Sequence, residues 1–422
     1  MSAPSSNSEV PKPQRAFEAL EIRGYPAYLT TFVLTMMADN IEHVISYWVM
    51  FQKFQSSALA GFAVVSHWLP FLLFSVPVGA LNDRFDSRRL IQIGGVLFAL
   101  VSLGWGYLFL TDTLQIWHCM VLLVLHGLAG VFWSTSSQVL LYDIVGPGAL
   151  ASAVRLNATG RYLGVLVGPA VGSASLLLLG PVVGIFVNAA CYLPLLIWLM
   201  RAPYGRHFRA VAAGPKRAVR GLADILQTVR DVRGLPVLSA MLVLAGGASF
   251  FVGNSYHAQM PEFARDLGHG NPGVLYTSLL GADAAGALLA GFVLESRRGL
   301  LRLSARTALK LALGWALSLL SFALAPNFAL ALALLFLAGF FELSFSSSAQ
   351  TLVQMQAPEA VRGRVLGLFT MAASGLRTFS GITVGLLGSA TNIHTSLALS
   401  AGAFVAVTIV LLLRSNREVA PA

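Results

Sequence analysis

Residues 28–51 read YLTTFVLTMMADNIEHVISYWVMF, an apolar run that carries two carboxylates and an imidazole near its middle. A helix needs about 20 apolar residues to cross the hydrocarbon core of a bilayer, and this run is long enough. A charged side chain at that depth costs about 2.5–3.5 kcal/mol on insertion scales, so it usually faces a partner or a watery cavity. The run therefore predicts a membrane helix that carries a functional site.

The composition of the whole chain extends this reading. The 422 residues are 56% hydrophobic and only 11% charged, with a mean hydropathy of +0.73. A soluble core cannot hide that much apolar surface, so we predict an all-α, multi-pass membrane protein. Twelve apolar segments are long enough to span a bilayer. They are 26–51, 58–80, 90–110, 114–141, 151–178, 181–200, 235–259, 273–294, 304–325, 328–352, 361–386 and 395–413.

The long polar stretch 201–234 divides six predicted helices from six. The expected order is a cytoplasmic N-terminal segment, a six-helix bundle, a cytoplasmic linker, a second six-helix bundle and a cytoplasmic tail. Their bounds are 1–25, 26–200, 201–234, 235–413 and 414–422. We expect a solvated linker, with binding to anionic lipid as the alternative.

The distribution of Lys and Arg predicts the orientation. With both termini in the cytoplasm, all but four of the 28 basic residues lie on cytoplasmic segments or the adjoining helix ends. The exceptions are Lys53, Arg161, Arg265 and Arg377. Basic residues favour the cytoplasmic side, which accounts for the net charge of +10 without a nucleic-acid partner.

The two halves show signs of an internal duplication. At an offset of 212, Gly79 meets Gly291 and Asp83 meets Glu295, at the ends of the second and eighth predicted helices. Further matches at nearby offsets pair the fifth helix with the eleventh and give both first helices Asn-x-x-His, at 40–43 and 254–257. Transporters are often built from such repeats, so we predict two pseudo-symmetric bundles.

The loop after the second predicted helix reads GALNDRFDSRR, residues 79–89. It resembles the signature loop of the major facilitator superfamily, with Asp86 and Ser87 in place of the usual glycine and basic residue. The resemblance implies the fold of that family and a loop that locks the two halves together on the cytoplasmic side. Physically, a glycine allows close helix approach, and a carboxylate can meet a helix N-terminus. The implied gate residues are Gly79, Asp83, Arg84, Arg88 and Arg89.

The fifth predicted helix carries glycines spaced by four, a pattern that lets helices pack closely. The order also resembles an exporter motif of the same superfamily, with Arg155 and Ser173 replacing its outer glycines. The matching residues are Gly164, Gly168, Pro169 and Gly172. Two further stretches, FEALEIRGYPAYL and PEAVRGRVLGLF, look like the branch that includes the enterobactin exporter and bacterial drug exporters. That branch implies the bacterial inner membrane.

The polar residues inside predicted spans are the candidates for proton coupling or substrate binding. They are Asp39, Asn40, Glu42, His43, Asn254, His257, Asp283, Glu342 and Arg377. Asp39, Glu42 and His43 can share one helix face, which the resemblance places beside a central cavity. We expect Asp39 to be the principal proton-coupling group. The structural alternative is that Asp39 and Glu42 pair with Arg161 or Arg377.

Isolated histidines in apolar context, namely His67, His126 and His257, are expected to play hydrogen-bonded packing roles. We predict no metal site, although His43, Glu42 and His257 are of suitable ligand types.

The sequence thus predicts a secondary active transporter, a proton-coupled exporter of a bulky amphipathic small molecule such as a drug-like compound or a siderophore. The alternative is an importer or facilitator of the same fold for a polar or metal-chelate substrate. No phosphate-binding loop of the Gly-x-x-x-x-Gly-Lys-Ser/Thr type occurs, so ATP hydrolysis is not expected. Without a readable nucleophile and base pair, we predict no enzyme and no cofactor. The expected partners are the substrate, protons and the bilayer, with the chain as a monomer.

Overall fold

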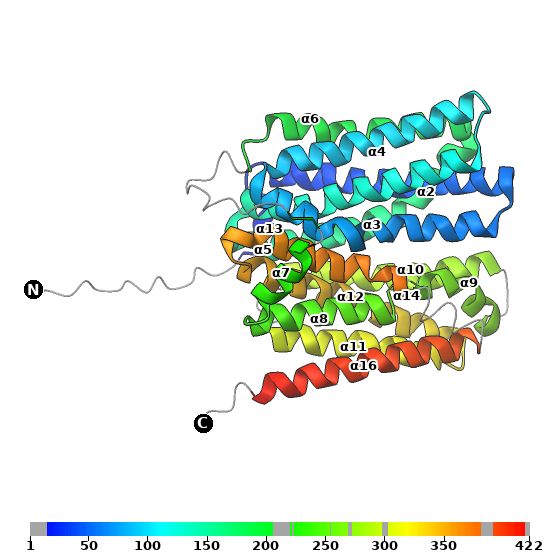
Figure 1. Cartoon of the computed structure of the whole chain (residues 1–422). Coiled ribbons are helices and arrows are strands. Elements are labelled where there is room, and N and C mark those ends of the chain that lie inside the picture. Colours follow the sequence, from blue (N-terminus) through cyan, green and yellow to red (C-terminus); the bar gives the residue numbers. More distant parts are fainter. Residues whose placement is uncertain are drawn as a thin grey trace, which may run out of the picture.

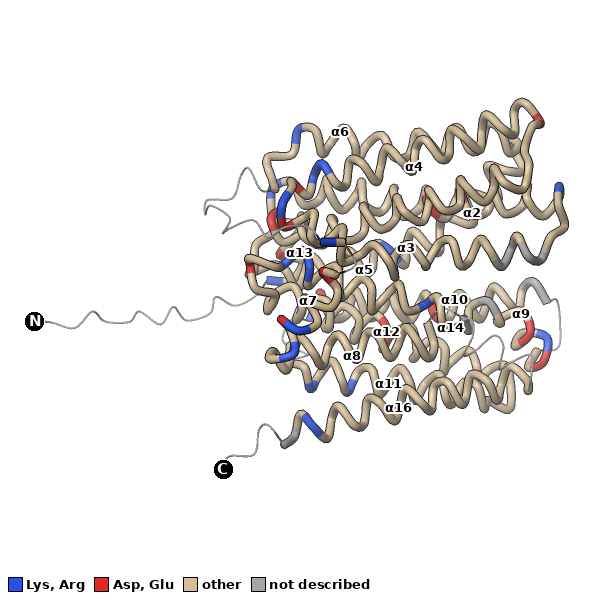
Figure 2. Tube along the Cα trace, viewed as in Figure 1, with Lys and Arg blue, Asp and Glu red and all other residues tan. Residues whose placement is uncertain are grey.

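The structure is a computed structural model that describes residues 15–205, 220–221, 223–253, 255–268, 272–297, 303–380 and 391–417. The candidate Asn254 lies outside the described residues, as do much of the predicted linker and both extreme termini. Helices run side by side in two groups, one from each half of the chain (Figure 1). Figure 2 shows Lys and Arg gathered at the end of the bundle where α2 begins and α16 ends, which we call the basic end.

Three long helices and one much longer helix that turns twice make up most of the first half. Its elements are α1 (Glu18–Glu21), α2 (Tyr25–Phe54), α3 (Ser57–Arg84), α4 (Ser87–Leu110), α5 (Ile116–Cys191) and α6 (Leu193–Arg201). Within α5 the chain turns sharply at Gly146 and Gly180, which have φ of 65° and 75°. Each glycine precedes a proline, and Gly-Pro ends one helix and starts the next, because glycine tolerates positive φ and proline fits the first helical turn.

The second half has the same succession, with two interruptions. Its elements are α7 (Ala223–Val232), α8 (Pro236–Phe251), α9 (Ser255–Leu267), α10 (Pro272–Ser296), α11 (Ala305–Ala323), α12 (Phe328–Gln356), η2 (Glu359–Val361), α13 (Arg362–Thr370), the π-helical turn η3 (Met371–Gly375), α14 (Arg377–Ser380) and α16 (Ile393–Arg417). The predicted continuous span 235–259 is broken between α8 and α9, where Gly253 has φ of 52°. The predicted span 361–386 is interrupted by η3.

These two breaks lie against each other. A Cβ on Gly253 would lie 2.4 Å from Ser380 Oγ, and Ser249 Oγ donates to the Ala373 carbonyl over 3.1 Å. A π-helical turn frees carbonyls from the regular helix ladder, and side chains can then bind them. The Ser249 side chain of one broken helix thus binds a backbone carbonyl of the other inside the second half.

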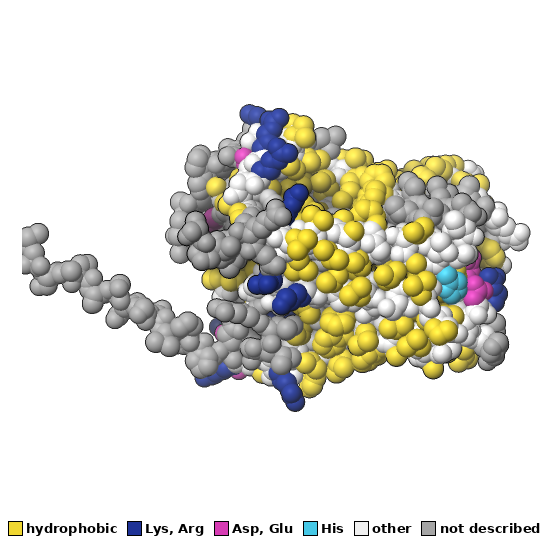
Figure 3. All heavy atoms as spheres, turned by 90° about the horizontal axis from the view of Figure 1, so that it is seen from below, with side chains coloured by type: hydrophobic (Ala, Val, Ile, Leu, Met, Phe, Trp, Pro, Cys, Tyr) yellow, Lys and Arg dark blue, Asp and Glu magenta, His cyan; other side chains and the backbone are white. Residues whose placement is uncertain are grey.

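The outer surface matches a bilayer. Figure 3 shows hydrophobic side chains covering the side of the bundle, with Lys and Arg near the basic end. Six helices of the described chain are long and apolar enough to cross a membrane by length and composition alone. The predicted fold class, an all-α membrane protein of two six-helix bundles, is confirmed: the described residues form helices joined by short connections and no strand.

Candidate functional site

A buried histidine bridges the two carboxylates of α2. His126, in the first segment of α5, places Nε2 2.8 Å from Asp39 Oδ1 and Nδ1 2.8 Å from Glu42 Oε1. The carboxylates are three residues apart on α2, so their side chains can lie on one face of the helix and reach a single ring. We call Asp39, His126 and Glu42 the carboxylate–histidine trio.

The inner end of the trio is enclosed. Glu42 and His126 are only 2% and 3% exposed, and Ser102 of α4 donates to Glu42 Oε2. Asn188 in turn donates to Ser102 Oγ over 3.2 Å. The Asp39 side chain is 19% exposed. The trio thus has one buried, hydrogen-bonded carboxylate and one that water can reach.

The geometry fixes a minimum number of protons in the trio. A neutral imidazole has one N–H, so it can donate to only one of two ionised carboxylates and would turn a lone pair toward the other. Either the ring is an imidazolium or one carboxyl group is protonated. The trio therefore carries one proton more than it would with both carboxylates ionised and the imidazole neutral.

His126 was expected to be hydrogen-bonded, and it is, but its partners are two carboxylates of another helix. These contacts pair Asp39 and Glu42 with His126 instead of Arg161 or Arg377, the partners of the structural alternative. Arg377 instead donates from Nε to the Ala373 carbonyl over 3.1 Å, and its guanidinium lies 4.9 Å from the centre of the Trp68 ring.

Two more imidazoles border the trio. His43 Nδ1 lies 3.9 Å from Asp39 Oδ2, and the His43 ring centre lies 4.8 Å from that of His126. His67 of α3 has its ring centre 5.0 Å from that of His43. His67 thus has imidazole neighbours on two other helices, while its Nδ1 makes no hydrogen bond among the described residues. Asn40 turns away from this group and donates to its own helix at the Met36 carbonyl over 2.8 Å.

The candidates of the second half form a separate polar group. His257 Nε2 lies 3.1 Å from Asp283 Oδ2, in keeping with the hydrogen-bonded role expected of His257. The Tyr256 hydroxyl lies 3.5 Å from Glu342 Oε2. The sequence therefore selects buried polar residues in both halves, and the structure brings them into two groups, although Arg377 of the second half also lies against Trp68 of the first.

The glycines of the predicted fifth helix pack against α2. A Cβ on Gly164 would lie 2.7 Å from Met36 Cβ, and one on Gly168 would lie 2.6 Å from Asn40 Cβ. Gly172 faces Ile41 at 3.2 Å in the same way. This close packing, which continues past Pro169, holds the helix that carries Asp39 and Glu42 against α5.

At the basic end, Asp83 of the first half meets the start of α13 in the second. Its carboxylate accepts from the backbone N–H groups of Gly363 over 2.6 Å and Arg364 over 3.2 Å, and from Arg364 Nη1 over 2.9 Å. A Cβ on Gly79 would lie 2.1 Å from the Gly363 carbonyl oxygen. The helices can approach this closely because both contact residues are glycine, and the helix N-terminus favours the anion.

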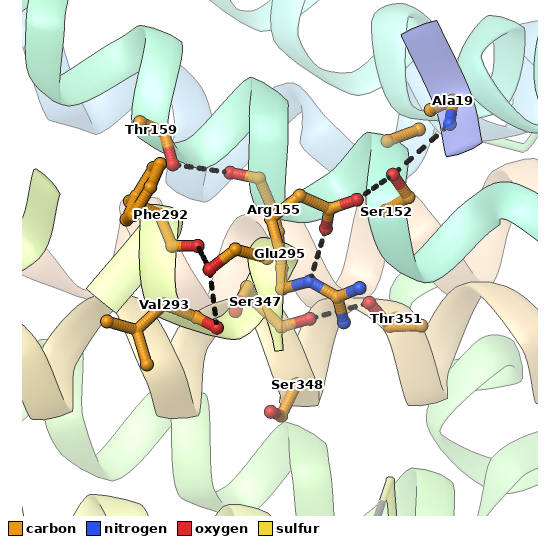
Figure 4. Close-up of polar contacts among 12 residues, drawn as sticks. Ala19, Ser152, Arg155, Thr159, Phe292, Val293, Glu295, Ser347, Ser348 and Thr351 are labelled. Atoms are coloured by element: carbon orange, nitrogen blue, oxygen red, sulfur yellow. Dashed lines mark hydrogen bonds and ion pairs between the residues drawn. The ribbon is translucent and has the colours of Figure 1, made fainter. Parts of the chain in front are cut away.

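The duplication produces a matching contact between the halves at a second place on the basic end (Figure 4). Glu295, at the end of α10, accepts from Arg155 Nε over 2.8 Å and from the Ser152 hydroxyl. Ser152 Oγ also accepts from the Ala19 backbone N–H over 3.2 Å, which ties α1 to the same point. Arg155, which departs from the exporter motif, is therefore the cationic partner of Glu295. The sequence aligned Glu295 with Asp83 but did not select it as a site residue.

The remaining arginines of the 79–89 loop do not all contact the second half. Arg88 binds Asp86 over 2.8 Å and the Ala202 carbonyl over 2.6 Å, within the first half. Arg89 donates to Gln92 over 2.9 Å, and Arg84 lies 6.0 Å from the Phe85 ring centre. They therefore shape the loop and its attachment to the chain after α6.

The linker also reaches the contact between Asp83 and Arg364. Asp224 of α7 is 3% exposed, and its carboxylate accepts from Arg364 Nε over 3.1 Å. Arg364 is thus held between Asp83 and Asp224. At least this part of the predicted solvated linker is packed against the bundle rather than surrounded by water.

Comparison with known proteins identifies the family. Residues 25–420 match the family model described as transmembrane secretion effector. The chain is 26% identical over 396 residues to the multidrug efflux pump Tap of Mycobacterium tuberculosis, covering 89% of this chain and 90% of that protein. It is also 26% identical over 343 residues to the enterobactin exporter EntS of Citrobacter koseri, covering 79% of this chain and 78% of that protein.

A solved structure agrees on the fold. The fucose:proton symporter of Escherichia coli superimposes with a TM-score of 0.73 at 14% identity, covering 95% of this chain and 99% of that one. The predicted resemblance is confirmed, and the expectation of a transporter rather than an enzyme is confirmed with it. The chain is a multi-pass membrane transporter that belongs to the transmembrane secretion effector family of the major facilitator superfamily.

Proposed function

We propose that this protein is a proton-coupled exporter of a bulky amphipathic small molecule, working by alternating access as a monomer in a bacterial inner membrane with both termini in the cytoplasm. The observation that carries the proposal is the His126 bridge between Asp39 and Glu42. A coupling site must hold a proton in one state and release it in another. The trio holds a proton by its geometry and has one carboxylate within reach of water.

Release of that proton changes the site sharply. Without it, an imidazole lone pair faces a carboxylate at 2.8 Å, a repulsive contact that the trio can relieve by separating or by binding a cation. Asp39 is the mobile member, because Glu42 is fixed by Ser102 as well as by His126. Asp39 thus exchanges the proton, and His126 and Glu42 hold it, which extends the role expected of Asp39 alone.

The two contacts at the basic end hold the halves together there, so they oppose the opening of that end that alternating access requires. Asp83 and Glu295 each bind the opposite half, so opening that end requires breaking both. A ligand shifts such an equilibrium only by its differential affinity for the two states. Proton loading of the trio and substrate binding are the two events that bias it.

The substrate class rests on the relatives and on the aromatic residues. The relatives are described as a multidrug efflux pump and an enterobactin exporter. Trp68 lies beside Arg377 and His67, where it can line a central site. Trp133 is buried and stacked on Phe32 with ring centres 4.9 Å apart, so it packs inside the first half.

The test uses purified protein in proteoliposomes with ethidium as the probe and EDTA in all buffers. An imposed pH gradient should drive the dye against its concentration gradient in the parent, and Asp39→Asn should abolish this uphill movement while still binding dye. His118→Ala, which changes a half-buried histidine outside the trio, should match the parent. Dye movement down its gradient that ignores the pH gradient would point to a facilitator, and accumulation in the opposite sense to an importer.

A further inference from the structure

We propose that the imidazoles around the trio form a binding site for one divalent first-row transition-metal ion, with Zn²⁺ or Co²⁺ as representative ions. The ligands are His43, His67, His126 and Asp39. The three imidazoles come from α2, α3 and α5, and one nitrogen of each lies within 4.8 Å of the other two. Asp39 Oδ1 already lies 2.8 Å from His126 Nε2.

The first support is a buried nitrogen without a partner. Nδ1 of His67 is buried and makes no hydrogen bond among the described residues. A buried polar atom that is left unpaired costs free energy, and each such atom in a folded protein calls for an explanation. The neighbours of His67 include two further imidazoles, with ring centres 5.0 and 5.8 Å away, beside the Trp68 ring. A metal ion placed among the three rings would supply the missing partner.

The second support is the position of Glu42. Histidine ligands of metals almost always donate their other ring N–H to a carboxylate, a carbonyl or water, which fixes the tautomer and raises the basicity of the ligand. Glu42 Oε1 lies 2.8 Å from His126 Nδ1 and is itself held by Ser102. With Nδ1–H directed to Glu42, Nε2 of His126 is left as the metal-binding atom, on the side where Asp39 lies.

The third support is charge. Asp39 and Glu42 are two carboxylates inside a membrane helix, and the bridging proton neutralises only one of them. A divalent cation at the position of that proton balances both, with the imidazoles neutral. Three imidazoles and one carboxylate suit Zn²⁺, Co²⁺ or Ni²⁺ rather than Mg²⁺ or Ca²⁺, which prefer oxygen ligands.

The rings must close to bind an ion. Zn–N bonds of about 2.0–2.1 Å place tetrahedral ligand atoms roughly 3.3 Å apart, so the widest separation shrinks by about 1.5 Å. Side-chain rotations of His43 and His67 can supply this, because both are only partly buried. The ion takes the place of the bridging proton, so binding should expel that proton into water.

The binding test does not depend on transport. Protein purified without a polyhistidine tag is titrated with Co²⁺ after treatment with EDTA, and visible absorption reports the coordination. We expect one Co²⁺ per chain with the intense bands of a four- or five-coordinate ion, displaced by one equivalent of Zn²⁺. His67→Ala should weaken binding at least tenfold, because removing even an outer partner of a ligand costs about 10–100-fold in metal affinity.

Two comparisons make the outcome decisive. His118→Ala, which changes a half-buried histidine elsewhere in the first half, should bind like the parent. If His67→Ala unfolds in EDTA, His43→Gln takes its place. A parent that shows no such bands, or His67→Ala and His43→Gln variants that bind Co²⁺ as the parent does, would overturn the proposal. Since the dye transport assay contains EDTA, its result and the metal result are separable.

Discussion

Replacing Asp83 with Asn should open the basic end of the protein. The Asp83 carboxylate accepts three hydrogen bonds from Gly363 and Arg364 of the opposite half. Asparagine keeps one oxygen, so the contact at 2.6 Å to the Gly363 N–H can survive. Its amide NH₂ group would face the two Arg364 donors at the other position, and both of those bonds would be lost.

The expected magnitude follows from these two bonds. A hydrogen bond to a charged group contributes about 1.5–3 kcal/mol, so two contribute about 3–6 kcal/mol in the closed arrangement. Water restores part of this when the end opens, and Arg364 keeps its contact with Asp224. We therefore expect a shift of about 2–4 kcal/mol toward the open state. At about 1.4 kcal/mol per factor of ten, that is roughly 30- to 700-fold in the equilibrium constant.

The assay is double electron–electron resonance between spin labels at Arg89 and Glu359, two exposed positions at the basic end on opposite halves. The free cysteines Cys119 and Cys191 are first replaced by alanine. The variant should gain a population at longer distance that the parent lacks. Superimposable distance distributions in parent and variant would refute the reasoning.

A matched control removes the same charge elsewhere. Asp112 binds Lys53 over 2.6 Å at the opposite end of the bundle, and its side chain is 92% exposed. Exposed ion pairs contribute little, so Asp112→Asn should leave the distances unchanged. A shift in this control would show that the labels report a general loosening instead of the gate.

Three further outcomes are expected. Gly79→Ala should populate the same long distance, because its Cβ would lie 2.1 Å from the Gly363 carbonyl oxygen; an unchanged distribution would contradict the close approach of the halves. Gly168→Ala should lower the free energy of unfolding by about 1–3 kcal/mol through overpacking against α2, whereas Gly402→Ala, with open space around its Cβ, should not; equal thermal stabilities would count against the packing. A cysteine at Arg220 should react with impermeant reagents only from the cytoplasmic side, and labelling from outside would reverse the proposed orientation.

The sequence carried the signals for the fold because the bilayer imposes them. Apolar run length alone places the spans, since every backbone polar group must be satisfied within a helix. The breaks were less visible. Gly253 is one glycine among many in the chain, and only its φ of 52° against Ser380 shows that the helix stops there. The sequence of the π-helical turn, Met371–Gly375, contains no pattern that would predict a break in the helix.

The site was only partly predictable for a similar reason. Asp39 and Glu42 stand out because charge is rare in an apolar run, whereas His126 is linked to them only through a contact between helices more than 80 residues apart in sequence. Helix periodicity relates residues on one helix and cannot reveal such a pair. The signal that could have found it was the position of His126 in the fourth predicted helix, which the family resemblance places beside the cavity. In sequence, Arg155 is only a departure from the exporter motif, although its partner Glu295 aligns with Asp83.

The central claim is that the proton held between Asp39 and Glu42 by His126 is the one exchanged for substrate. The most direct test is proton release on adding ethidium to purified protein in weakly buffered detergent solution with EDTA. The parent should release close to one proton per bound dye, His126→Gln should bind dye without this release, and Glu342→Gln, which alters the second half, should retain it. Undiminished release from His126→Gln, with release lost in Glu342→Gln, would contradict the account and place the proton carrier in the second half.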